Sequence, residues 1–202
     1  MPNYETWTKE GIPSELRFHQ ANKWRQSEEF YNDSKGLFSR VGFKTFKELE
    51  GKTILDAGCG SKLRTAVFEG ANLIGLDPLL SEFSKIKWSD LNTLKETYSI
   101  PLESCSLGLM NRMDAIFCVN VLDHCYEWER VLDNLCSYLK DSGTLYLMLD
   151  VNRQKENVIH QRIDTGDLKI YLERIFTIES EAIEDKGFDS GCNKIMLVLK
   201  RK

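Results

Sequence analysis

The stretch that decides the fold of this chain is Thr53-Ile54-Leu55-Asp56-Ala57-Gly58-Cys59-Gly60. An apolar run leads into an acid and two glycines, which is the pattern of a buried strand that ends in a tight turn. A second apolar run, residues 73–76, also ends in an acid, Asp77. Glycines let a backbone approach a ligand closely, and a carboxylate can accept hydrogen bonds from both hydroxyls of a ribose. The two runs therefore predict a nucleoside-binding pocket at the carboxyl ends of parallel strands.

Two classes of nucleoside cofactor compete for such a pocket. The dinucleotide fingerprint G-x-G-x-x-G needs a glycine at position 63, where this chain has Leu63. Asp56 would also place a negative charge near a pyrophosphate, whereas a carboxylate suits a cationic ligand. The sequence therefore argues against a nicotinamide dinucleotide.

The pattern Asp56-x-Gly58-x-Gly60, with Asp77 after the next strand, resembles motif I and the second-strand acid of class I S-adenosylmethionine (SAM)-dependent methyltransferases. The resemblance covers roughly residues 52–200, and it departs from many members at Lys62, where they carry a third glycine. It implies SAM as the cofactor. The glycine loop would lie against the methionine and ribose, and Asp77 would bind the ribose hydroxyls.

Two later segments extend the resemblance. Asp90-Leu91 stands where the family places its adenine contacts, although Asp90 would also suit the N-cap of a helix. Residues 114–124 resemble the family's fourth strand and its exit loop. The cofactor-binding residues that the resemblance implies are Asp56, Ala57, Gly58, Cys59, Gly60, Asp77, Pro78, Asp90, Leu91, Asn120 and Val121.

The chain after residue 51 alternates apolar runs with helical patterns, which predicts an α/β fold with a doubly wound, mostly parallel seven-stranded sheet in three α/β/α layers. The polar residues 184–193 leave too little room for a crossover helix, so the sheet is expected to end in an antiparallel hairpin. The predicted strands are residues 53–57, 73–77, 86–88, 115–119, 144–149, 176–178 and 195–199. Helical segments are expected at residues 81–85, 91–98, 103–113 and 128–139, with a turn at 141–143.

The first fifty residues are rich in aromatic and charged side chains in helix-compatible patterns. They predict one or two helices that cover the front of the sheet as a lid, on a core of residues 51–202, within a single domain of residues 1–202. His19, Trp24 and Arg25 would belong to this lid, where an arginine or a histidine could bind the carboxylate of SAM. A plain amphipathic surface helix is the alternative.

Composition limits the kinds of molecule that this chain is expected to bind and the cellular compartment in which it is expected to act. The chain has 27 basic and 31 acidic residues and a net charge of −4, which gives no electrostatic footprint for nucleic acid. No apolar run approaches the ~20 residues of a membrane span, and residues 1–10 lack the apolar part of a signal peptide. The six cysteines and three histidines show no zinc-type spacing. These features predict a cytoplasmic monomer or homodimer without a bound metal.

Methyl transfer depends chiefly on alignment, and a general base is needed only for a hydroxyl or a cationic amine acceptor. His124, in the exit loop of the fourth strand, is the first candidate base, since its pKa can lie near neutrality. We expect His124 to shape the pocket wall instead, because the sequence shows no residue that would orient it. His160, in a front-face loop with residues 157–159, is the second candidate, and a surface histidine is its simpler interpretation. Asp123 and Asp150 are also expected near this edge.

The leading interpretation is a SAM-dependent methyltransferase that acts on a small molecule. A SAM-binding protein without turnover is one alternative. Methylation of RNA or protein is another, and the acidic balance of charge disfavours it. The exit of the fourth strand lacks the N-P-P-[YF] run of exocyclic-amine methylases, which argues against methylation of a base or a glutamine amide.

Overall fold

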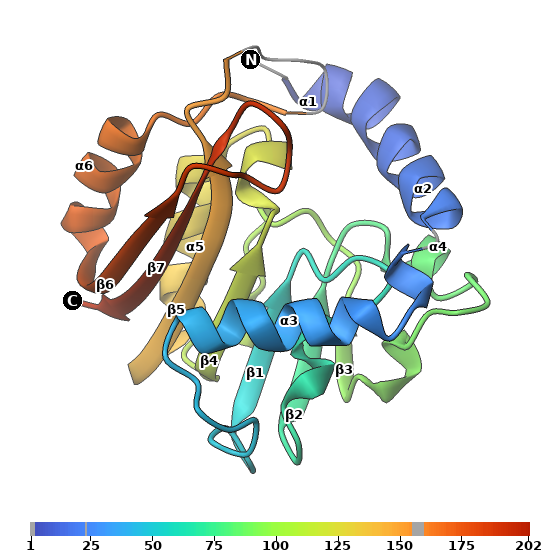
Figure 1. Cartoon of the computed structure of the whole chain (residues 1–202), viewed down its shortest axis with the longest axis horizontal. Helices are drawn as coiled ribbons and strands as arrows, with labels where there is room; N and C mark the ends of the chain where they lie inside the picture. The colour runs from blue at the N-terminus through green and yellow to red at the C-terminus, as the bar shows by residue number, and fades with distance from the viewer. Residues whose placement is uncertain (1–2, 23, 155–159) are drawn as a thin grey trace.

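The structure is a computed structural model that describes residues 3–22, 24–154 and 160–202. Seven strands form one sheet in the order β3-β2-β1-β4-β5-β7-β6 (Figure 1). The first five in this order run parallel to one another, and β7 lies antiparallel between β5 and β6. The strands are β1 (Thr53–Ala57), β2 (Asn72–Leu76), β3 (Glu96–Tyr98), β4 (Met113–Val119), β5 (Leu139–Val151), β6 (Phe176–Glu184) and β7 (Asn193–Arg201). The predicted fold class and terminal hairpin are confirmed.

Helices cover both faces of this sheet. Helix α3 crosses one face, whereas α5 lies behind the sheet and α6 lies beside the terminal hairpin (Figure 1). Helix α2, together with α1 and a π-helical turn (Trp7–Gly11) that join it, lies at the end of the molecule where the parallel strands finish. The α-helices are α1 (Tyr4–Thr6), α2 (Ile12–Ala21), α3 (Glu29–Arg40), α4 (Leu80–Phe83), α5 (Trp128–Tyr138) and α6 (Thr165–Ile175).

The alternation of side chains along each strand divides the core into two layers. In β1, Ile54 packs in the cluster that contains Phe38 of α3, whereas its neighbour Leu55 packs in the cluster that contains Leu132 of α5. Both strand residues are fully buried, as expected for a sheet with helices on each face. Stacking strengthens the α3 side, because the ring of Phe117 lies 4.7 Å from that of Tyr146.

Three local predictions between β2 and β5 are wrong. Residues 86–88 form turns, and the third strand is β3, a three-residue edge strand whose side chains are exposed or partly exposed. The segments 91–98 and 103–113 contain only single 3-10 turns at Leu91–Thr93 and Leu107–Leu109, apart from β3 and the start of β4. Residues 141–143 lie inside β5, where the register against β4 shifts. Helix α6 carried no prediction.

The N-terminal segment is helical, as its sequence indicates. Its last helix, α3, is held to the loop after β1, since Arg64 Nη1 donates to Asp33 Oδ2 at 2.7 Å. No helix among residues 3–22, 24–154 and 160–202 is both long and apolar enough to cross a membrane. Residues 155–159, which include part of the loop predicted to carry His160, lie outside the described residues.

Candidate active site

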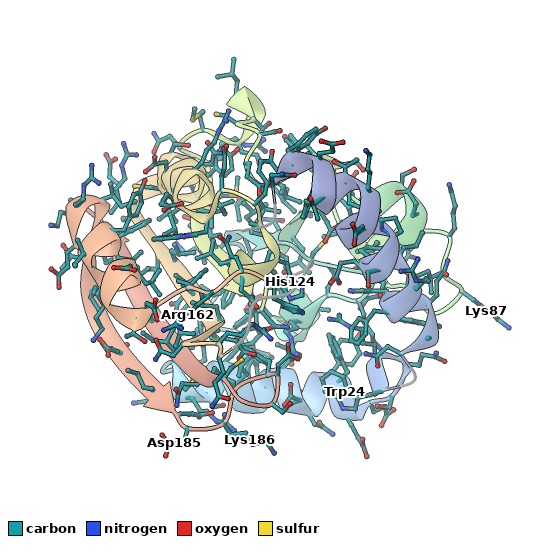
Figure 2. All side chains as sticks on the ribbon, turned by 90° about the horizontal axis from the view of Figure 1, so that it is seen from above. Trp24, Lys87, His124, Arg162, Asp185 and Lys186 are labelled. Carbon is teal, nitrogen blue, oxygen red and sulfur yellow. The ribbon has the colours of Figure 1, made fainter. Side chains whose placement is uncertain are left out.

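A cavity lies at the carboxyl ends of the parallel strands, where Ile12, Glu15 and His19 of α2 face the strand ends. Figure 2 views the molecule from this end, with His124 near its middle. Both predicted catalytic histidines, His124 and His160, line the cavity. The predicted cofactor residues that line it are Gly58, Gly60, Pro78, Asp77, Asn120 and Val121.

Two glycines allow the loop after β1 to pack against its neighbours. Gly58 has φ +71° and Gly60 has φ +64°, in the left-handed region that side chains rarely adopt. A Cβ on Gly58 would stand 2.4 Å from the Val121 side chain, and a Cβ on Gly60 would stand 2.5 Å from Cε1 of His19. The loop therefore requires glycine at both positions.

Asp77 lies at the end of β2 and faces both the loop and the cavity. Its Oδ2 accepts from Gly60 N at 3.0 Å, and its Oδ1 accepts from Leu79 N at 2.8 Å. Burial raises the pKa of this carboxyl to about 6, against those two backbone hydrogen bonds. Each carboxylate oxygen has a second lone pair, so Asp77 can hold the loop and still accept from a ligand.

Asp56 and its neighbours support the loop from behind the cavity wall. Asp56 Oδ2 accepts from the hydroxyl of Thr65 at 2.7 Å, and burial raises the pKa of Asp56 to about 6. Ala57 is completely buried in the core, and burial raises the pKa of the Cys59 thiol well above its usual range. These three predicted residues are not among those that line the cavity.

Asp90 and Leu91 also lie outside the cavity lining. Asp90 precedes β3 rather than following it, so the premise for its adenine role is not met. It accepts from Leu63 N at 2.9 Å and from the hydroxyl of Tyr31, which joins α3 to the loop after β1. The segment after β3 contributes Leu102 and Glu103 to the cavity, and the sequence pattern had placed Glu103 at the start of a helix.

Helix α2 and the residues that follow it form the opposite wall. His19 Nδ1 accepts from Ser61 N at 3.2 Å, and its ring stacks on Phe83 at 4.3 Å. Burial, with the nearby positive charge of Arg25, lowers the pKa of His19 to about 3, so its imidazole is neutral. Arg25 also lines the cavity, and its Nε has no hydrogen-bond partner among the described residues. Burial lowers the pKa of Arg25 to about 10, which leaves it charged at neutral pH.

His19 makes the stability of the protein depend on pH in a definite direction. An unfolded chain binds a proton on this histidine below about pH 6.5, whereas the folded imidazole stays neutral to about pH 3, so acid favours unfolding. Between about pH 7.5 and about pH 5.5 we expect the wild type to lose about 1 kcal/mol more unfolding free energy than His19→Gln. Urea denaturation at both pH values measures the difference. The raised pKa values of Asp56 and Asp77 stabilise the folded state in acid, but they do so in both proteins and cancel in the comparison. An equal pH dependence of the two proteins would contradict this role of His19.

His124 is held between two carboxylates. Its Nδ1 lies 3.0 Å from Oε1 of Glu15 on α2, and its Nε2 lies 3.9 Å from Oδ1 of Asp123. Burial opposes protonation, but Asp123 and Glu15 outweigh it and raise the pKa of His124 to about 9. An imidazole that is already protonated at neutral pH cannot accept a proton. Glu15 thus orients the imidazole of His124. The sequence pattern did not reveal this residue, because its one local signal is the i,i+4 spacing from His19, which is common in surface helices.

His160 belongs to the same cluster. Its ring centroid lies 4.1 Å from that of His124, and its Nδ1 lies 3.0 Å from Oδ2 of Asp123. Arg153 Nη2 donates to the same Asp123 oxygen and to Asp189 Oδ2, both at 3.0 Å. The structure therefore brings together residues from the β4 exit loop, the segment after β5 and the loop before β7. Asp189 was missed because it lies in the polar loop between β6 and β7.

Comparison with known proteins agrees with this architecture. The family described as "Methyltransferase domain" matches residues 24–185. The chain is 25% identical over 162 residues to a ubiquinone biosynthesis O-methyltransferase of Psychrobacter cryohalolentis, covering 77% of this chain and 62% of that protein. It is 30% identical over 146 residues to a tRNA U34 carboxymethyltransferase of Pseudoalteromonas translucida, covering 63% of this chain and 45% of that protein. The chain thus spans less than two thirds of either relative.

The fold itself also has a solved counterpart. A 1,6-didemethyltoxoflavin-N1-methyltransferase of Burkholderia thailandensis superposes with a TM-score of 0.68 at 14% identity, covering 98% of this chain and 89% of that one. At that identity the similarity concerns the fold alone. The family match over residues 24–185 is what identifies the chain: it belongs to the methyltransferase-domain family, within the class I SAM-dependent methyltransferases that its sequence resembles.

Proposed function

We propose that this chain transfers the methyl group of SAM to a small-molecule acceptor. The observation that carries the proposal is the cavity in which the glycine loop and Asp77 face the acidic and aromatic residues of the N-terminal segment. The wall at the strand ends offers a glycine loop and a carboxylate that can bind a nucleoside. The wall formed by the N-terminal segment encloses the space beside them. The predicted lid role of residues 1–50 forms part of this proposal.

The chemistry of the walls fits the three polar parts of SAM. Asp77 is placed to accept from the ribose hydroxyls, which are donors. Glu103 is 2% exposed, lines the cavity beyond β3 and has an acceptor for an adenine amine, which replaces the earlier assignment to Asp90. Arg25 is charged and has an unpartnered Nε, so it suits a carboxylate better than the neutral His19 does.

SAM supplies an activated methyl group on a positively charged sulfur. The residues of this chain bind and orient the two reactants. The glycine loop positions the cofactor, and the cavity walls exclude water and hold the acceptor in line with the methyl group. His124, protonated beside Glu15, forms part of the wall under this proposal, as the sequence led us to expect.

The charge of the cavity favours a small acceptor over a nucleic acid. Glu15, Glu103 and Asp189 line it together with Asp77, whereas Arg25 is its one lining arginine among the described residues. Phosphate groups are repelled by such a wall, since RNA is bound mainly through contacts of basic residues with its backbone. The two relatives differ in their acceptors by name, so the charge of this wall is what decides our choice.

Calorimetry with SAM and with NAD tests the cofactor, and we expect micromolar binding of SAM and no heat with NAD. Incubation with SAM and a protein-free metabolite extract should form S-adenosylhomocysteine, whereas incubation with bulk tRNA should form none. Heat with NAD alone would refute the cofactor assignment. Product with tRNA alone would make RNA the acceptor, and SAM binding without product from either pool would indicate a binding protein.

A further inference from the structure

We propose that Asp123, His124 and His160 form a binding site for one divalent metal ion of the Zn²⁺ type at the acceptor end of the cavity. Each of the three residues offers one ligand atom, and these atoms lie within 4.8 Å of one another. Two imidazoles and one carboxylate are a donor set that binds Zn²⁺ and similar ions, and three protein ligands leave positions open to other molecules.

Two of the ligand atoms have no other partner. Oδ1 of Asp123 and Nε2 of His124 are buried without a hydrogen bond among the described residues, although Asp123 is only 1% exposed. The two atoms face each other across 3.9 Å. The two atoms are too far apart for a hydrogen bond to each other, and a buried polar atom without a hydrogen bond is costly. An ion bound to both atoms would give the carboxylate oxygen and the ring nitrogen the partner that each lacks.

The remaining atoms of these side chains are held as metal ligands usually are. Glu15 Oε1 lies 3.0 Å from Nδ1 of His124, which places a carboxylate behind a ligating imidazole and leaves Nε2 for the ion. Arg153 binds Oδ2 of Asp123 and so fixes the carboxylate with Oδ1 turned to His124. His160 approaches from a separate segment, with its ring 4.1 Å from that of His124.

The charges around the cluster also favour a cation. Glu15, Asp123, Asp150 and Asp189 surround it, and Arg153 is the charged basic side chain that faces them, through contacts of 3.0 Å to Asp123 and Asp189 and 3.9 Å to Asp150. The four carboxylates outnumber this single arginine, so negative charge is in excess. A divalent ion offsets most of this excess, whereas a single arginine does not.

The site opens into the cavity, since His124 and His160 line it. An ion there would have coordination positions directed at the space for the acceptor. If the proposed methyl transfer holds, an acceptor that binds the ion through an oxygen, nitrogen or sulfur atom follows from this placement, and that consequence alone rests on the proposed function. Binding of the ion itself requires neither SAM nor an acceptor.

Competition of the full chain with a chromogenic zinc chelator tests the proposal. We expect one Zn²⁺ per chain with micromolar or tighter affinity, weakened by at least about a hundredfold in Asp123→Asn and in His124→Asn. The matched control is His19→Gln, a buried histidine of the same cavity outside the cluster, which should leave Zn²⁺ affinity unchanged. Mg²⁺, which prefers oxygen ligands alone, should not compete.

Substitution with Co²⁺ separates this site from the six cysteines, because thiolate ligands give a charge-transfer absorption that nitrogen and oxygen ligands lack. We expect no such band. Thermal unfolding verifies that each variant folds, and a rise in the melting temperature of the wild type with Zn²⁺ that is absent from His124→Asn gives a second measurement. Absence of Zn²⁺ binding by the wild type, or equal binding by both ligand variants, would overturn the proposal and leave the methyltransferase assignment intact.

Discussion

Asp77→Ala should weaken SAM binding by about 5- to 150-fold, which corresponds to about 1–3 kcal/mol. The carboxylate is the acceptor that we assign to the ribose hydroxyls, and it also holds Gly60 N at 3.0 Å, so its removal loses a ligand contact and loosens the glycine loop. Titration calorimetry of both proteins with SAM gives the ratio. Binding by the wild type should also weaken below about pH 6, where the carboxyl becomes protonated.

The matched control for this variant is Asp90→Ala. Asp90 also accepts a hydrogen bond from the loop after β1, through Leu63 N at 2.9 Å, but it lies outside the cavity lining. We expect Asp90→Ala to change SAM affinity by less than about threefold, because Asp90 does not line the cavity. Equal losses in the two variants would mean that both act through the loop, or that Asp90 contacts adenine as its position in the sequence suggested.

Gly58→Ala should lower the free energy of unfolding by about 2–5 kcal/mol and abolish SAM binding at micromolar concentrations. Two costs combine at this position, the left-handed φ of +71° and the 2.4 Å approach of the new Cβ to Val121. Urea denaturation measures the first effect, and calorimetry of the folded fraction measures the second.

Gly51→Ala separates those two costs. Gly51 has a nearly equal φ of +73°, yet no atom lies within 4 Å of the position of its Cβ. It should therefore lose only the conformational part, about 1–2 kcal/mol. Adding Val121→Ala to Gly58→Ala should recover part of the steric cost. Equal losses at the two glycines would show that close packing against Val121 is unimportant.

The central strands were predictable from sequence because their environment is uniform. Residues 54–57 and 115–118 are buried between the two helix layers and read as apolar runs, and a glycine turn directly follows the first of them. β3 lies at the edge with exposed or partly exposed side chains, so it carries no apolar signal, whereas Trp88 and Ile86 supplied a false one. Apolar periodicity reports burial, and it fails where a strand is not buried.

The site was predictable only in part, for a related reason. Gly58 and Asp77 follow strands directly, and Gly60 belongs to the short turn after Gly58, so the register of the sheet places them. Glu15 meets His124 from 109 positions away, and no local pattern encodes such a contact. Asp189 meets Arg153 in the same way, from a loop whose course depends on how β6 and β7 pair. Long-range pairs of charged side chains need the three-dimensional fold before they can be recognised.

Two parts of the chain form the cavity, the ends of the parallel strands and the N-terminal helix α2, and only the first belongs to the sheet. The strand ends contribute Gly58 and Asp77, which shape and hold the glycine loop, whereas Ile12 and Glu15 belong to a short helix that takes no part in the sheet. Mutations in that helix therefore leave the pairing of the strands intact. Selection can alter this wall of the cavity while the strand ends stay unchanged, and a library confined to residues 7–18, which keeps His19 and its contact with the glycine loop, is a direct way to redirect this protein to a new acceptor.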